Sequence, residues 1–89
     1  MGTIKKFAII WKDDFTEEQH KKLVEVLGEE GWDFDDDYKN GYLDFETDCS
    51  WSFRLDKFLR DKDVKGKFTI EETFMERDPD ETYQYDGGN

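Results

Sequence analysis

The stretch Trp32–Asp48, WDFDDDYKNGYLDFETD, decides the fold of this chain. Bulky apolar residues alternate with acidic ones on both sides of Asn40-Gly41. That dipeptide favours a two-residue type I′ turn, because both turn positions need a positive φ. The stretch therefore predicts a hairpin of two strands, Trp32–Tyr38 and Tyr42–Asp48.

The register of this hairpin assigns its side chains to two faces. A two-residue turn pairs Lys39 with Tyr42, and each further pair lies one residue along both strands. Asp36 then falls on the apolar face, where it does not fit, so a bulge or frayed pairing is expected there. The other residues of that face are apolar and are expected to form core: Trp32, Phe34, Tyr38, Leu43 and Phe45.

The remaining elements follow from hydrophobic periodicity and from capping residues. Ile4–Lys12 is apolar on both faces, which is typical of a central strand. Thr16–Glu30 reads as a helix that begins with a capping box of Thr16 and Gln19. Further along, the sequence predicts a helix from Ser50 or Ser52 to about Lys62, a strand over Gly66–Arg77, a turn at Asp78-Pro79-Asp80 and a short edge strand over Thr82–Tyr85.

This order of elements is β-α-β-β-α-β with one additional C-terminal edge strand. The predicted fold is α+β: a ferredoxin-like antiparallel sheet with two helices on one face. All 89 residues are expected to form a single domain, with residues 86–89 as a loose tail.

Charge limits the kinds of partner. The chain has 24 acidic and 13 basic residues, a net charge of −11, yet 17% of its residues are aromatic, which favours a folded domain over an acidic disordered chain. Phosphate backbones and anionic membranes would repel it, so direct nucleic-acid or membrane binding is not expected. A basic protein partner is favoured, although acidity can also serve solubility alone.

Alternation places six carboxylates on the face of the hairpin that points away from the core, with only Lys39 nearby. Like charges opposite each other destabilise a sheet, so their retention suggests a binding role; the alternative is a solvated sheet face. A second acidic stretch near the C-terminus could extend the surface, with Tyr83 as an interface anchor. The predicted partner-binding residues are Asp33, Asp35, Asp37, Asp44, Glu46, Asp48, Glu71, Glu76, Asp78, Asp80, Glu81 and Tyr83.

Catalytic and metal-binding residues are not predicted. His20 is the only histidine and is expected to be half-buried packing, while Cys49 is the only cysteine and has no predictable histidine partner. Residues 36–47 partly match a calcium loop, but Thr47 stands where the bidentate glutamate is needed. No cofactor is expected. The longest apolar run, Phe7–Trp11, is too short to span a membrane, and a cytoplasmic protein is expected.

In size and charge the chain resembles the small acidic proteins with which bacteriophages block host defences, the DNA-mimic anti-restriction and anti-CRISPR proteins. The acid-rich stretches Asp33–Asp48 and Glu71–Glu81 on an aromatic-cored domain carry this resemblance. It implies an inhibitor that occupies the basic groove of a defence nuclease or another DNA-binding protein, in the cytoplasm of the host cell. The alternatives are an immunity or antitoxin-like protein that neutralises one basic toxin, an acidic subunit without mimicry, and a small metal-dependent enzyme. An exposed edge strand also leaves a homodimer open.

Overall fold

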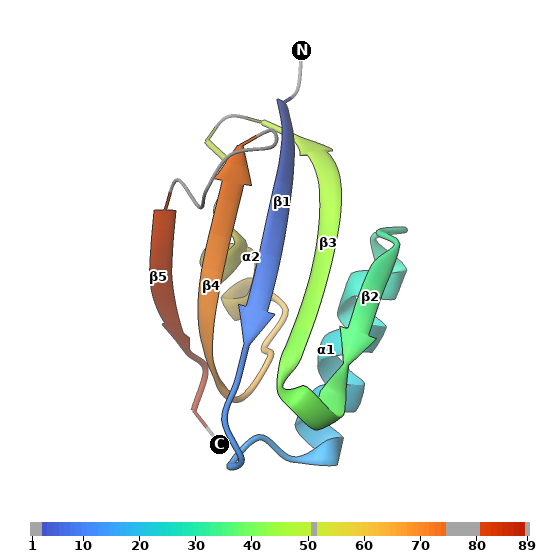
Figure 1. Ribbon diagram of the computed structural model, residues 1–89, viewed down its shortest axis with the longest axis vertical. Coiled ribbons are helices and arrows are strands. Elements are labelled where there is room, and N and C mark those ends of the chain that lie inside the picture. Colours follow the sequence, from blue (N-terminus) through green and yellow to red (C-terminus); the bar gives the residue numbers. More distant parts are fainter. Residues whose placement is uncertain (1–2, 51, 75–80, 89) are drawn as a thin grey trace.

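The computed structural model describes residues 3–50, 52–74 and 81–88. Five strands form one antiparallel sheet in the order β2-β3-β1-β4-β5. Both helices lie behind this sheet in Figure 1. The elements in chain order are β1 (Thr3–Ile10), α1 (Glu17–Glu29), β2 (Phe34–Asp37), the 3-10 turn η1 (Tyr38–Asn40), β3 (Tyr42–Cys49), α2 (Leu55–Asp61), β4 (Lys67–Phe74) and β5 (Glu81–Asp86).

The hydrophobic core lies between the helices and one face of the sheet, which we call the inner face; the opposite face is the outer face. Side chains alternate between the two faces along every strand, so each strand contributes every second residue to the core. Each large apolar side chain buried there contributes roughly 1.5–3 kcal/mol to the free energy of folding. The residues at most 3% exposed include Phe7, Ile9, Leu23, Leu27, Leu43, Phe45, Leu55, Leu59, Phe68 and Ile70.

The first helix begins and ends as the sequence predicts. The Gln19 backbone N–H donates to the Thr16 hydroxyl at 3.2 Å, and the Thr16 N–H donates to the Gln19 side chain at 3.0 Å, which completes the capping box. Gly31, with φ of 78°, follows the last turn. Gly31 therefore ends α1, while Gly28 lies within it.

The α+β class and the antiparallel sheet are confirmed, and β1 is the central strand. The additional C-terminal strand is present as β5 at the edge of the sheet. With five strands, the sheet differs in strand number and order from a four-stranded ferredoxin-like sheet. The predicted turn at Asp78-Pro79-Asp80 and the end of the strand predicted up to Arg77 lie outside the described residues.

The predicted hairpin exists, but its turn and register were wrong. Tyr38–Asn40 form η1 and only Gly41 has positive φ, 72°, so four residues connect the strands instead of two. Asp37 pairs with Tyr42, where the type I′ turn would place Lys39. The cause is Tyr38, whose ring packs near Trp11 and whose hydroxyl donates to the Phe15 carbonyl at 3.2 Å. A shift of two residues keeps every side chain on its predicted face.

The predicted serine cap of the second helix was also wrong. The helix begins at Leu55, and its N-cap residue, Arg54, makes no side-chain capping bond. The hydroxyls of Ser50 and Ser52 instead lie 3.0 Å apart, and the Phe53 N–H donates to the Ser50 carbonyl at 3.0 Å. These bonds form a turn between β3 and α2. Trp51 lies outside the described residues.

Candidate functional site

The outer face carries most of the predicted acidic residues. The register of β2 with β3 places Asp35 directly opposite Asp44, and the same register brings Asp33 level with Glu46 just before β2 begins. Asp37 and Asp48 lie further along the same two strands and are exposed. The helices cover only the inner face, so these carboxylates stand on an uncovered sheet surface.

Four of these acids line one hollow. It has a volume of about 340 Å³, lies over β2 and β3, and is called here the acidic hollow. Its lining consists of Lys6, Asp33, Asp35, Asp44, Phe45 and Glu46. The hollow thus gathers four carboxylates and one ammonium group. This part of the molecular surface therefore carries an excess of negative charge.

The base next to these acids is Lys6, whereas the sequence indicated Lys39. Lys6 lies on β1 opposite Glu46, and its Nζ lies 3.6 Å from Asp44 Oδ2. The Tyr42 hydroxyl donates to the same carboxylate at 3.1 Å. Burial, this hydrogen bond and the nearby charge raise the pKa of Tyr42. Asp44 is therefore held by two neighbours, while Asp33, Asp35 and Glu46 remain exposed around it.

The second acidic stretch joins this surface only in part. Glu71 lies on the outer face of β4, and Ala8 of β1 stands between it and Asp44. Glu81 lies on the inner face and is bound by Arg54 at 3.0 Å. The structure therefore brings Glu71, but not Glu81, to the acids of the hairpin. Glu76, Asp78 and Asp80 lie outside the described residues.

Tyr83 is not beside the hairpin acids. It lies on the inner side of β5, half-buried, with the Arg54 guanidinium 4.3 Å from its ring centre. Its hydroxyl donates to Glu72 Oε2 at 2.6 Å, and Glu72 Oε1 accepts from Lys5 Nζ at 3.1 Å. Burial first, and then the bond to Glu72, raise the pKa of Tyr83 far above its usual value. Glu72 and Lys5 are only 5% and 9% exposed, and no pattern in the sequence predicted this buried polar cluster.

His20 is the polar partner of Asp36, the acidic residue that the sequence places on the apolar face of the hairpin. Its Nε2 lies 2.7 Å from Asp36 Oδ2, and its ring lies among Trp11, Phe15 and Tyr38. A histidine–aspartate pair can transfer a proton. To catalyse a reaction, the histidine also needs a nucleophile or a substrate group at its other ring nitrogen. Among the described residues, the ring neighbours of His20 are aromatic, and the Tyr38 hydroxyl is already bonded to Phe15.

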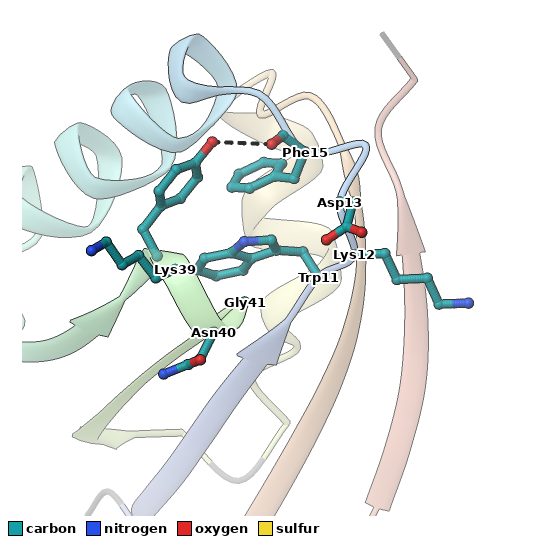
Figure 2. Close-up of a pocket in the computed structure, with 8 residues that line it drawn as sticks. Trp11, Lys12, Asp13, Phe15, Lys39, Asn40 and Gly41 are labelled. Atoms are coloured by element: carbon teal, nitrogen blue, oxygen red, sulfur yellow. Dashed lines mark hydrogen bonds between the residues drawn. The ribbon is translucent and has the colours of Figure 1, made fainter.

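A second hollow, of about 230 Å³, lies beside this pair between the loop after β1 and the turn η1. Figure 2 shows Trp11 in the middle of the lining residues and the side chains of Lys12 and Lys39 extending to opposite sides. The two ammonium groups do not converge on one point, so the hollow does not form an anion site. Its full lining is Trp11, Lys12, Asp13, Phe15, Tyr38, Lys39, Asn40 and Gly41.

The thiol of Cys49 is a further group whose reactivity can be judged from its surroundings. Burial is the main cause that raises the pKa of the Cys49 thiol, which keeps it protonated and a poor nucleophile at neutral pH. Within the described ranges, no three His, Cys, Asp or Glu side chains are grouped as metal ligands would be. No helix in the described part of the chain has the length and apolar character needed to cross a membrane.

Comparison of the chain with protein-family models, with curated proteins and with solved structures found no match. The function must therefore be argued from the geometry and charge of the molecule itself.

Proposed function

We propose that this chain is an acidic protein-binding inhibitor, which presents its outer face to the basic nucleic-acid groove of a DNA-binding protein. The observation that carries the proposal is the meeting of four carboxylates in the acidic hollow, with Lys6 as the single base of its lining. Complementary charge steers such a complex and selects basic partners. The hollow opens on a sheet face that neither helix covers, so a partner can reach it.

The spacing of the acids supports mimicry of a phosphate backbone. Residues on one face of a strand repeat about every 6.6 Å, and neighbouring strands lie about 4.8 Å apart. The pairs Asp33–Glu46 and Asp35–Asp44 therefore place about one charge per 3.3 Å along the strands, against one per 3.4 Å along a single strand of B-DNA. Lys6 offsets one of these four charges, so a groove that binds one strand of DNA would meet a comparable spacing of carboxylates and a somewhat lower net negative charge.

The sheet supplies a stiff platform for these charges. In the proposal the scaffold is a ferredoxin-like arrangement extended by one strand: β1-α1-β2 and β3-α2-β4 are two interleaved β-α-β units, and β5 adds an edge. The inhibitor would act in the cytoplasm, where DNA-binding host defence nucleases of the restriction or CRISPR type work. It would bind the nuclease and not the nucleic acid.

The mixed character of the outer face favours one alternative, an immunity-like protein that neutralises a single basic toxin. Ile4 is 61% exposed on this face, and the half-buried Tyr42 lies beside Asp44. Apolar and aromatic groups among the acids suit a specific protein interface better than they suit a general backbone mimic.

A competition experiment tests the proposal. A basic nuclease is bound to labelled duplex DNA, and the protein is titrated as competitor at several salt concentrations. We expect displacement of the DNA that weakens as salt increases. In the hollow variant, Asp33, Asp35 and Asp44 are replaced by asparagine and Glu46 by glutamine. Because each lost charge pair contributes roughly 0.2–1 kcal/mol, the four together contribute about 0.8–4 kcal/mol, and this variant should compete about fourfold to roughly a thousandfold less well.

A matched control separates the site from net charge. Replacing the exposed acids Asp14, Glu25, Glu29 and Asp61 by their amides removes the same four charges from other surfaces. This control should compete almost as well as the unaltered protein. Equal losses in both variants would show that net charge alone acts, and no loss in the hollow variant would overturn the proposal. Inhibition of one toxin only, sensitive to Tyr42→Ala, would favour the immunity-like alternative.

A further inference from the structure

The two edges of the sheet differ in how they are protected against pairing with another chain. β2 has four residues, three of them aspartates, and short charged edge strands resist further pairing. β5 has six residues with the uncharged centre Thr82–Tyr85, which is rich in strand-forming residues. In the described part of the chain, β5 pairs only with β4 and its other edge is open.

Basic side chains lie near the acids at both ends of β5, and one of them forms an ion pair. Arg54 Nη1 lies 3.0 Å from Glu81 Oε1. At the other end, Lys67 is the cross-strand partner of Asp86, and Arg60 Nη1 donates to the Asp86 carbonyl at 3.4 Å. Among the described residues, the acidic and basic side chains at this edge are therefore close to balance, in contrast with the acidic hollow.

The charge that would hold two copies apart lies at the far side of the sheet. The acids of the hollow lie on or beside β3 and β2, which are three and four strand spacings from β5, about 14 and 19 Å at about 4.8 Å each. The Debye length at physiological ionic strength is about 8 Å. The carboxylates of one acidic hollow are therefore largely screened from a second copy that approaches along β5.

The pleat of the strand also favours self-pairing. Opposite residues in an antiparallel pair share a face of the sheet. Glu81 lies on the inner face and Asp86 on the outer face, so two β5 strands cannot place Glu81 opposite Asp86 of the second copy. The allowed registers instead set Tyr83 opposite Tyr83, or Gln84 opposite Gln84. Both avoid a like-charge pair at the centre and use side chains that can stack or hydrogen-bond.

We infer that two copies of this chain associate through antiparallel β5 edges around a two-fold axis, forming one continuous sheet of ten strands, five from each copy. Such a contact is isologous: the same strand of each copy supplies both sides. The inference rests on β5 and its neighbours, and it holds or fails independently of the function proposed for the acidic hollow.

Sedimentation of the purified full chain over a concentration series tests the inference. We expect a reversible monomer–dimer equilibrium in which the dimer becomes more stable as salt increases, since each copy carries a net charge of −11. Amide hydrogen exchange should slow in the peptide that covers β5 when the dimer is populated, while β2 stays unchanged. A chain that stays monomeric at millimolar concentration, or a dimer with unchanged exchange in β5, would overturn the inference.

Two lysine substitutions on the outer face provide a matched pair. Gln84→Lys places a charge at the pairing edge, and Thr73→Lys places the same charge on β4, within the sheet. Both make the chain less negative, so any general charge effect would strengthen association in both. We expect Gln84→Lys to weaken the dimer at least about tenfold, because the two lysines lie opposite each other in the Gln84 register and diagonally across the axis in the Tyr83 register, and we expect Thr73→Lys to retain it. If Gln84→Lys is poorly folded by circular dichroism, Gln84→Arg places the same charge at the same position and makes the same test. Equal dimerisation in the edge and control variants contradicts the inference.

Discussion

His20 on α1 lies with its Nε2 2.7 Å from Asp36 Oδ2 on β2, and this contact joins the first helix to the edge strand of the acidic hollow. Asp36 is the one acidic residue of β2 that faces inward. Its side chain is 27% exposed, and that of His20 is 18% exposed. A carboxylate at this position would be unfavourable alone, and the histidine supplies the partner that the position needs.

Replacing Asp36 by alanine should lower the free energy of unfolding by about 1–2 kcal/mol, because His20 then loses its partner in a half-buried place. Urea denaturation measures this change. Asp35→Ala is the control, since Asp35 is the next residue and faces outward toward Asp44. Removing that like-charge pair should leave stability unchanged or raise it by roughly 0.2–1 kcal/mol. If both variants lose the same stability, the inward contact has no special role.

The faces of the hairpin could be predicted from the sequence, but its register could not. Alternation fixes which residues share a face, and a two-residue error in register leaves that assignment intact. The turn type depended on Tyr38, which leaves the strand to pack near Trp11 and His20. Those neighbours come from the loop after β1 and from α1, so the turn preference of Asn40-Gly41 alone does not predict the turn that forms.

The acidic surface was predictable for the same reason, and its compensating groups were not. Asp35 and Asp44 belong to one hairpin, so pattern alone places them together. Lys6 reaches Asp44 because β1 lies beside β3, and Arg54 reaches Glu81 because α2 lies against β5. Both contacts depend on strand order and helix docking. Tyr83 was expected at a binding surface, but its partner is the buried Glu72.

The buried pair of Lys5 and Glu72 should show strong coupling. Lys5→Met leaves the Glu72 carboxylate, whose side chain is 7% exposed, without its ammonium partner, and should cost about 3–5 kcal/mol. Glu72→Gln in the same chain removes the uncompensated charge and keeps an acceptor for Tyr83. The double variant should therefore be more stable than Lys5→Met alone. Denaturation of the two single variants and the double variant completes the cycle, and strict additivity would show that the pair is not coupled.

Stability should decrease in alkaline solution because of Tyr83. Its pKa is raised in the folded protein by burial and by the bond to Glu72, while an unfolded chain has the usual value of 10.0. Above that pH the unfolded chain releases the proton and the folded chain retains it, so increasing pH favours unfolding; below it the contribution is present in full. Tyrosinate absorbance, followed together with circular dichroism, should show ionisation that accompanies unfolding. In Tyr83→Phe the loss of stability above pH 10.0 should be less steep. An unchanged slope would mean that Tyr83 does not contribute.

Two glycines should respond to alanine in opposite directions. Gly41 has φ of 72°, and a Cβ there would lie 2.5 Å from the carbonyl oxygen of Trp11. The Gly41 carbonyl also accepts from the Trp11 N–H at 3.0 Å, so the turn cannot move away without losing that bond. Gly41→Ala should therefore destabilise the protein by at least about 1–3 kcal/mol.

Gly28 lies within α1, with nothing inside 4 Å of a Cβ. Gly28→Ala should raise stability by roughly 0.5–1 kcal/mol, since alanine loses less backbone entropy in a helix. For a domain of this size, about 1 kcal/mol shifts the melting temperature by about 4–8 °C, so thermal unfolding separates the two variants clearly. A melting temperature that Gly41→Ala leaves unchanged would mean that the turn adopts another conformation, and the pairing of Asp35 with Asp44, on which the acidic hollow depends, would need to be revised.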